Sequence, residues 1–157
     1  MLLKPLLPLL VCSAFSAAAQ EPPGFAIVAH GISWHNHNYA GDGTPYNERN
    51  PGLGLRLTVA PDTSVQAGRY RNSFSTQAQP RWSNYVVADW LPAIVVGANV
   101  GLFAGLVNGY PTINDGRPIP VAGAVVRAHF GRFNLTLRAS PSKDSHSVAA
   151  LEIGYQL

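Results

Sequence analysis

The sequence predicts an all-β protein, an eight-stranded antiparallel up-and-down transmembrane β-barrel, and three observations carry this prediction. From Phe25 onward apolar and polar residues alternate between turn signals, in segments of the length expected for barrel strands, roughly 9–11 residues. Only 12% of the residues are charged, about half of the roughly 25% that soluble domains carry. No uninterrupted apolar run reaches the length of about 20 residues that a membrane helix needs.

An export signal is predicted at the start of the chain. Lys4 provides a positive start, an apolar stretch follows over residues 5–15, and the small residues of "SAAAQ" offer a cleavage site. The apolar stretch is too short to span a bilayer as a helix. We therefore expect residues 1–19 to be a signal peptide and residues 20–157 to be the barrel domain.

The alternative is a lipoprotein signal that ends at Cys12, but the bulky Val11 stands where lipoprotein processing requires a small residue. Signal cleavage would remove Lys4 and Cys12, which leaves ten basic residues, eight acidic residues and no cysteine. The exported domain would then have no disulfide. Because the remaining basic residues form no cluster in the sequence, nucleic acid is not expected as a partner.

The connections between the predicted strands alternate in length, beginning with a long one. The strands are expected over 25–38, 52–59, 64–74, 81–90, 94–107, 119–129, 132–139 and 147–157. Their short turns are "APDT", "LPA" and "FGR". Long and short connections alternate in this way in outer-membrane barrels that keep both termini in the periplasm. We therefore expect a monomer in a bacterial outer membrane, surrounded by membrane lipids.

The alternation assigns faces to three strands. The residues expected to face lipid are Leu53, Leu55, Leu57, Val59, Phe133, Leu135, Leu137, Leu151, Ile153, Tyr155 and Leu157. Arg56, Arg138 and Glu152 fall on the inward face and must pair there, because buried charges need partners. The faces of 64–74 are left open, since "SVQAGRYRNSF" places arginines on both sides of Tyr70.

The glycines expected inside the barrel suggest space in the lumen. They are Gly52, Gly54, Gly97, Gly101 and Gly105. We expect the volume they leave to admit a hydrocarbon chain or a detergent tail. The segment 91–107 is apolar enough to be read as a helix, but three glycines would each cost a helix about 1 kcal/mol, so a strand is favoured.

The aromatic residues fall into two bands at opposite strand ends. Phe25, Trp90, Phe130, Phe133 and Tyr155 lie beside short turns or termini. Trp34, Tyr39, Tyr46, Phe74, Trp82 and Tyr110 lie beside long loops. Two aromatic girdles are what the two interfaces of a bilayer select. A soluble barrel of the lipocalin type shares the strand pattern and is the alternative.

His35 and His37 lie near the end of the first predicted strand, in "SWHNH". They could bind a metal ion, act as a base, or simply line the lumen. A metal site would need a third ligand, and no other histidine, cysteine or carboxylate stands at a characteristic spacing. A metal ion is therefore not expected, and neither is a cofactor.

Several segments resemble, in order, the lipid A palmitoyltransferases of outer membranes. The most specific is "YNERNPGLGL" at 46–55, which is similar to a Tyr-Asn-Glu-Arg segment before a glycine-rich strand in that family. "SWH" at 33–35 resembles a strand that ends in a catalytic histidine, and "YRNSF" at 70–74 resembles an element that carries a catalytic aspartate and serine. "GLFAGLV", "IPVAGAVV" and "FNLTLRASP" resemble the later strands. The resemblance covers nearly all of the chain that follows the signal.

The resemblance implies a catalytic site of His35, Asn72 and Ser73, with phospholipid and lipopolysaccharide as partners. Asn72 stands where the family has its aspartate, and Asp42 or Glu48 could supply the missing carboxylate. The family's amphipathic helix before the first strand is absent from "QEPPG". Two functions are therefore open: transfer of an acyl chain from a phospholipid to lipid A, or a non-catalytic barrel that binds lipid or stabilises the envelope.

Overall fold

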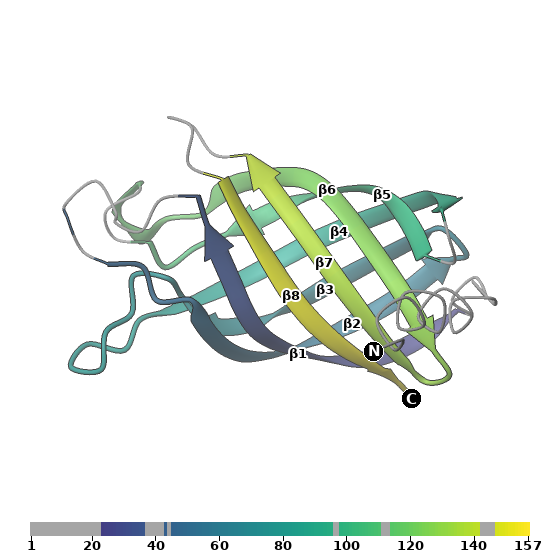
Figure 1. The fold of residues 1–157 in the computed structure, drawn as a ribbon, viewed down its shortest axis with the longest axis horizontal. Helices are drawn as coiled ribbons and strands as arrows, with labels where there is room; N and C mark the ends of the chain where they lie inside the picture. The colour runs from purple at the N-terminus through teal and green to yellow at the C-terminus, as the bar shows by residue number, and fades with distance from the viewer. Residues whose placement is uncertain (1–22, 37–42, 44, 96–97, 111–113, 142–146) are drawn as a thin grey trace, which may run out of the picture.

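The fold is a closed barrel of eight antiparallel strands in chain order, seen in a computed structural model (Figure 1). The structure describes residues 23–36, 43, 45–95, 98–110, 114–141 and 147–157. The strands are β1 (Gly24–His35), β2 (Arg49–Ala60), β3 (Thr63–Arg71), β4 (Trp82–Val95), β5 (Ala98–Val107), β6 (Ile119–Phe130), β7 (Phe133–Pro141) and β8 (Ser147–Gln156). A short 3₁₀ turn, η1 (Asn114–Gly116), precedes β6. In the described part of the chain, no helix has the length and apolarity to cross a membrane.

The predicted fold class, strand number and order of long and short connections are confirmed. β1 pairs with both β2 and β8, which closes the barrel. The connections after β1, β3, β5 and β7 are the long ones, and the end of the barrel that carries them is called the loop end. The opposite end, with the three short connections, is called the turn end.

Several strand boundaries differ from the sequence prediction by three residues or more: the second strand begins at Arg49 and the fifth at Ala98. The fourth strand does not turn at "LPA" but continues to Val95, with a shift of register between Trp90 and Ala93. Pro92 lies inside that irregularity, where a residue without an N–H can be accommodated. The third strand ends at Arg71, not at Phe74, because the chain folds into the β3–β4 loop there.

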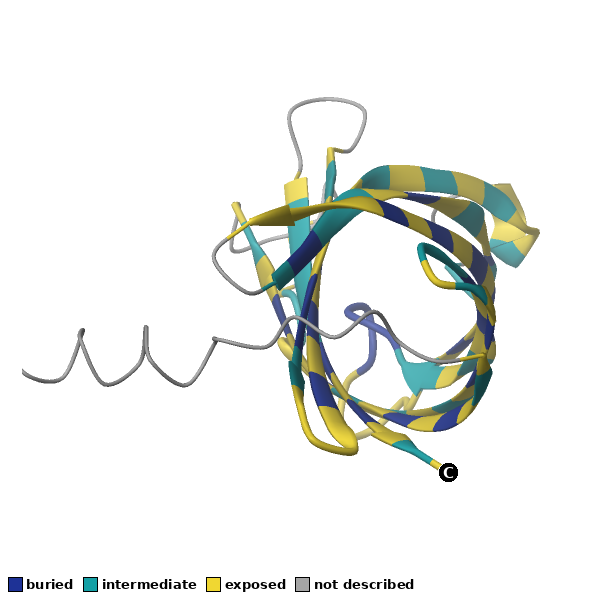
Figure 2. Cartoon of the chain, turned by 90° about the vertical axis from the view of Figure 1, so that its right-hand side faces the viewer, coloured by how far each residue is buried: buried dark blue, intermediate teal, exposed yellow. Residues whose placement is uncertain are grey.

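Buried and exposed residues alternate along the strands, as the bands in Figure 2 show. The predicted outward leucines of β2 and β7 are exposed, with Leu53 at 67%. Together with their neighbours they form an apolar outer belt of the kind that faces lipid. The open question of the third strand is settled: Gln66 faces the lumen, whereas Val65 and Arg69 face outward.

A polar network fills the turn-end half of the lumen. Asp89 accepts hydrogen bonds from Arg127 Nη2 at 2.5 Å and from Arg138 Nη2 at 2.7 Å. Arg138 also forms an ion pair with Glu152, as the sequence predicted. Arg56 is fully buried in the same half. Buried charges are tolerated when they are paired and hydrogen-bonded in this way.

The prediction that Gly52 and Gly54 leave empty volume is wrong. A side chain at Gly54 would collide with the Tyr85 hydroxyl, and one at Gly52 would collide with Tyr70. Gly54 instead gives room for the Tyr85 ring, and Gly52 allows close approach of the backbone at Arg69 and Tyr70. Gly101 and Gly105 lie close to the backbone of β4, and Gly97 lies outside the described residues.

Candidate functional site: a lumenal cavity at the loop end

A cavity of about 500 Å³ occupies the loop-end half of the lumen. Its apolar wall is built by Val87, Phe103, Val107, Ile119 and Val121 from β4, β5 and β6. Its floor includes His30, Tyr85, Arg138 and Glu152, and its rim includes His35, Tyr46, Ser73, Phe74 and Tyr110. The predicted space for a hydrocarbon chain therefore exists in this half, whereas the polar network fills the other half.

A β-bulge in β1 turns His35 toward this cavity. The pairing of β1 with β8 shifts between His30 and Ile32, so Gly31 is an extra residue on β1. Strict alternation from His30 would point Trp34 inward and His35 outward. After the bulge the order is reversed: Trp34 is 44% exposed, and His35 lines the cavity.

The His35 ring is part of an aromatic rim. It stacks on Tyr46, with ring centroids 4.1 Å apart and an angle of 13° between the planes. The Tyr46 ring meets Phe74 edge-on at 5.5 Å, and Phe74 meets Tyr110 at 5.6 Å. Desolvation raises the pKa of Tyr110, so its hydroxyl stays neutral and can share a hydrogen bond with Tyr70 at 2.7 Å.

The structure brings together two of the three predicted catalytic residues. Ser73 lines the same cavity as His35, and its carbonyl oxygen accepts a hydrogen bond from the Asn47 N–H at 2.7 Å. Glu48 is exposed and is not among the residues that line the cavity. His37 and Asp42 lie outside the described residues.

Asn72, the third predicted residue, is fully buried and holds loops together. Its Nδ2 donates to the Gly109 carbonyl at 2.8 Å and to Ser83 Oγ at 3.3 Å. Its Oδ1 accepts from the Phe74 N–H at 3.1 Å. The side chain thereby joins the β3–β4 loop to β4 and to the start of the β5–β6 loop, and it does not line the cavity.

His30, which was not singled out from the sequence, lies at the centre of a hydrogen-bonded chain on the cavity floor. Its Nε2 is 2.7 Å from the Tyr85 hydroxyl, and its Nδ1 is 3.3 Å from Glu152 Oε1. Gln66 Nε2 donates to the Tyr85 oxygen at 2.8 Å. The Tyr85 hydroxyl thus links Gln66 to Nε2 of His30, and Nδ1 of His30 lies beside the Glu152 carboxylate. His30 could not be identified from the sequence, because its place opposite Glu152 depends on the register between β1 and β8.

The pairing between β6 and β7 stops before the loop end. Their register runs only from Phe130 opposite Phe133 to Ala124 opposite Ala139. Among the described residues, 119–123 of β6 therefore have ladder partners on β5 alone. Beyond that point, Ser140 Oγ donates to the Ala122 carbonyl at 2.8 Å, a side-chain bond in place of the ladder.

The cavity reaches the barrel's exterior through this region, where β6 has no ladder partner among the described residues of β7. Ile119 and Val121 line it from the inward face of β6, and Pro120 and Ala122 line it from the outward face. Pro141 lines it from the end of β7. Two prolines at these positions remove backbone donors that could otherwise close the ladder. The cavity thus opens sideways through the wall between β6 and β7.

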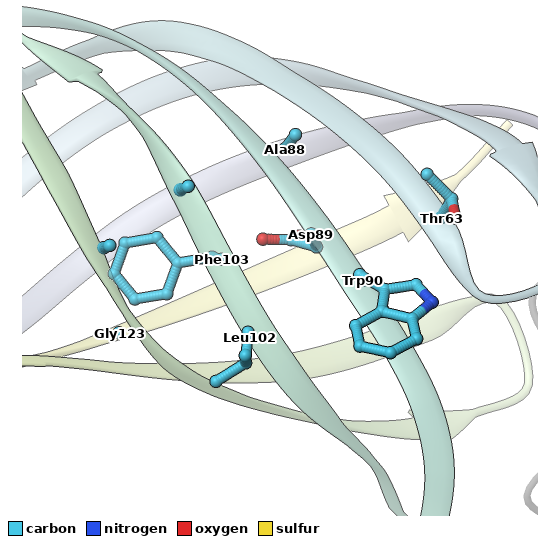
Figure 3. A pocket seen from close by; sticks show the side chains of 9 residues that line it. Thr63, Ala88, Asp89, Trp90, Leu102, Phe103 and Gly123 are labelled. Atoms are coloured by element: carbon cyan, nitrogen blue, oxygen red, sulfur yellow. The ribbon is translucent and has the colours of Figure 1, made fainter.

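A depression of about 580 Å³ lies over β4, β5 and β6 (Figure 3). Ala88, Ala104 and Ala122 lie opposite one another on these strands and form its base, with Trp90 and Leu102 beside them. The depression forms because these three neighbouring alanines project less from the sheet than the larger side chains around them. Ala122 contributes to both this surface and the lateral opening.

Comparison with solved structures places the chain among transmembrane β-barrels. A de novo designed transmembrane β-barrel matches with a TM-score of 0.59 and 16% identity, covering 88% of this chain and 99% of the design. A second designed barrel, solved by NMR in solution, matches with a TM-score of 0.57 and 17% identity, covering 88% and 98%. The outer membrane protein Ail of Yersinia pestis, in a phospholipid nanodisc, matches with a TM-score of 0.45 and 15% identity, covering 85% and 99%.

The similarity to the two designed barrels establishes the fold alone. No protein-family model matches the sequence, and no curated protein matches it. Within the part of the chain that the structure describes, no group of three or more histidine, cysteine or acidic residues is placed to hold a metal ion.

Proposed function

We propose that the protein is an outer-membrane barrel that takes one hydrocarbon chain of a membrane lipid into its lumen through the opening between β6 and β7. The observation that carries this proposal is the cavity lining, which includes both the inward Val121 and the outward Ala122 of one strand. A chain could pass from the bilayer into the cavity without leaving an apolar environment. The long loops would lie outside the cell and the termini in the periplasm.

The size and lining of the cavity support this proposal. A volume of about 500 Å³ lies within the range of about 300–1,000 Å³ that small-molecule sites occupy. The wall from β4 to β6 is apolar, and polar groups are confined to the rim and floor. Such an arrangement suits an amphiphile whose chain lies inside and whose head group stays at the loop end.

Filling the cavity is expected to abolish lipid binding. In Val121→Trp an indole would occupy the space beside the opening, and we expect the capture of a photoreactive phospholipid in the lumen to fall by a factor of about 10 or more, as steric exclusion would cause. The measurement is mass spectrometry of cross-linked peptides from the purified barrel in bilayers.

Val126→Trp is the matched control, because Val126 lies on the same strand but faces outward at 37% exposure. Its lumenal labelling should equal that of the unmodified protein. Equal labelling of the lumen in both variants would exclude the cavity as the lipid site.

A second candidate function is acyl transfer from a phospholipid to lipid A, which the shared position of His35 and Ser73 on the cavity favours. In this reaction His35 takes the proton of a lipid A hydroxyl, and the hydroxyl oxygen forms a new ester with the acyl carbonyl. The ester bond of the phospholipid breaks, and its oxygen receives the proton from His35. Ser73 would act as a polar partner at the rim.

One experiment distinguishes lipid binding from acyl transfer. The protein is expressed in an outer membrane that lacks other acyltransferases, and lipid A is weighed by mass spectrometry. Acyl transfer predicts one added acyl mass that disappears in His35→Ala and is reduced in Ser73→Ala. An unchanged lipid A beside a correctly inserted, lipid-labelled barrel would exclude transfer and leave lipid binding.

A further inference from the structure

Four arginines lie at the loop end of strands β2 to β4, and two of them, Arg69 and Arg71, flank the outward-facing Trp82. This arginine cluster consists of Arg49, Arg69, Arg71 and Arg81, from β2, β3 and the residue before β4. It lies on strands β2 to β4, whereas the lateral opening lies between β6 and β7. The cluster is therefore a feature separate from the cavity.

The charges outside the lumen are distributed unevenly between the two ends of the barrel. Among the described residues, the loop end carries five arginines and only two acidic residues. These are Arg49, Arg69, Arg71, Arg81 and Arg117 against Glu48 and Asp115. The described part of the turn end carries Arg132 and Asp62. The loop end is thus cationic, and four of its five arginines belong to the cluster.

The cluster lies where the apolar outer belt ends. Arg69 pairs across the sheet with Leu53, the most exposed of the belt leucines. Its guanidinium lies over the Trp82 ring, 5.2 Å from the centroid. Trp82 is 42% exposed and pairs in register with Arg71. An exposed tryptophan beside arginines at the edge of a lipid-facing belt marks the level of lipid head groups.

Hydrogen bonds hold the Arg71 side chain and the backbone at and beside Arg81 and Arg49. Arg71 Nε donates to Ser75 Oγ at 2.7 Å, and Arg71 Nη2 donates to the Thr76 carbonyl at 2.6 Å. The Arg81 N–H donates to the same Ser75 oxygen at 3.0 Å. Asn50, next to Arg49, donates through Nδ2 to the Arg71 carbonyl at 2.9 Å. A side chain that is already held, as Arg71 is, loses little conformational freedom when an anion binds.

We propose that the arginine cluster binds the phosphate of an anionic membrane lipid whose chains lie along the outer face of β2 to β4. Guanidinium groups pair with phosphate through two parallel hydrogen bonds. The exposed Leu53 and the Trp82 ring supply the apolar surface that the lipid chains contact. A lipid is the expected partner because cation, aromatic ring and apolar belt adjoin on one face.

The test uses the full barrel in phosphatidylcholine nanodiscs that contain either phosphatidic acid or diacylglycerol, which differ by the phosphate alone. Native mass spectrometry counts the retained lipid. We expect retention of phosphatidic acid and not of diacylglycerol. Arg69→Gln should weaken binding about fivefold and the Arg49→Gln/Arg69→Gln pair about 25-fold, since each surface arginine contributes about that factor. Arg71 is left unchanged because it holds the loop.

Arg132→Gln is the matched control, since it removes one exposed arginine at the turn end; its binding should stay within about twofold of the unmodified protein. Heat-modifiable migration on a gel verifies that each variant is folded. The proposal is overturned if the folded double variant retains as much phosphatidic acid as Arg132→Gln does. Equal retention of diacylglycerol, or full displacement of phosphatidic acid by millimolar inorganic phosphate, would also overturn it.

Discussion

Replacing Asp89 with alanine is expected to lower the free energy of unfolding by about 3–5 kcal/mol, the cost of breaking a buried ion pair by removing one partner. Asp89 accepts hydrogen bonds from Arg127 Nη2, from Arg138 Nη2 at 2.7 Å and from Arg138 Nε at 3.2 Å. Its removal would leave two buried guanidinium groups to share the charge of Glu152. The measurement is urea unfolding in lipid vesicles, followed by tryptophan fluorescence.

Asp62→Ala is the control for this experiment. Asp62 lies in the short β2–β3 turn and accepts a hydrogen bond from Trp90 Nε1 at 3.1 Å. Asp62 also accepts a hydrogen bond from Thr63 Oγ1 at 2.9 Å. Loss of these two exposed bonds should cost about 1–2 kcal/mol. If the two variants unfolded at the same urea concentration, the network around Asp89 would contribute no more than a surface contact.

The barrel could be predicted from the sequence because its wall separates lipid from a polar lumen. That separation imposes a period of two on every strand. The period correctly identified the outward leucines of β2 and β7. The inward and outward faces of the third strand could not be assigned from the sequence, because the charged Arg69 faces outward and the aromatic Tyr70 faces inward. An arginine at the head-group level is stable on the outside, since its charged end reaches the interface.

The site was harder to predict from the sequence than the barrel, because it depends on strand register rather than on periodicity. His35 faces the cavity only because Gly31 adds one residue to β1. The lateral opening lies where β6 extends toward the loop end beyond Ala124, the last of its residues that pairs with a described residue of β7. His30 and Glu152 are more than a hundred residues apart in the chain and meet only when β8 closes the barrel against β1.

Replacing Asn72 with aspartate is the second change with a large expected effect, and it tests the resemblance to acyltransferases directly. In that family an aspartate belongs to the catalytic set, so restoring it would be expected to create activity. The geometry of Asn72 leads to the opposite expectation. A carboxylate oxygen would stand 2.8 Å from the Gly109 carbonyl oxygen, where the amide now donates a hydrogen bond. We expect a loss of about 3 kcal/mol in the free energy of unfolding, as for a buried acceptor left without a donor.

Asn84→Asp serves as the matched control, because Asn84 is an exposed amide on β4. Among the described residues its side chain makes one hydrogen bond, a long contact of 3.4 Å with Asn108. Its free energy of unfolding should change by about 0.5 kcal/mol or less. Both variants are unfolded in urea, and both are expressed for the lipid A measurement described above. Asn72→Asp should show lower stability and no added acyl mass, because its side chain is committed to the loops. A stable Asn72→Asp barrel that gained acyl transfer dependent on His35 would instead place residue 72 in the reacting site, and the loop-holding role assigned to Asn72 would be wrong.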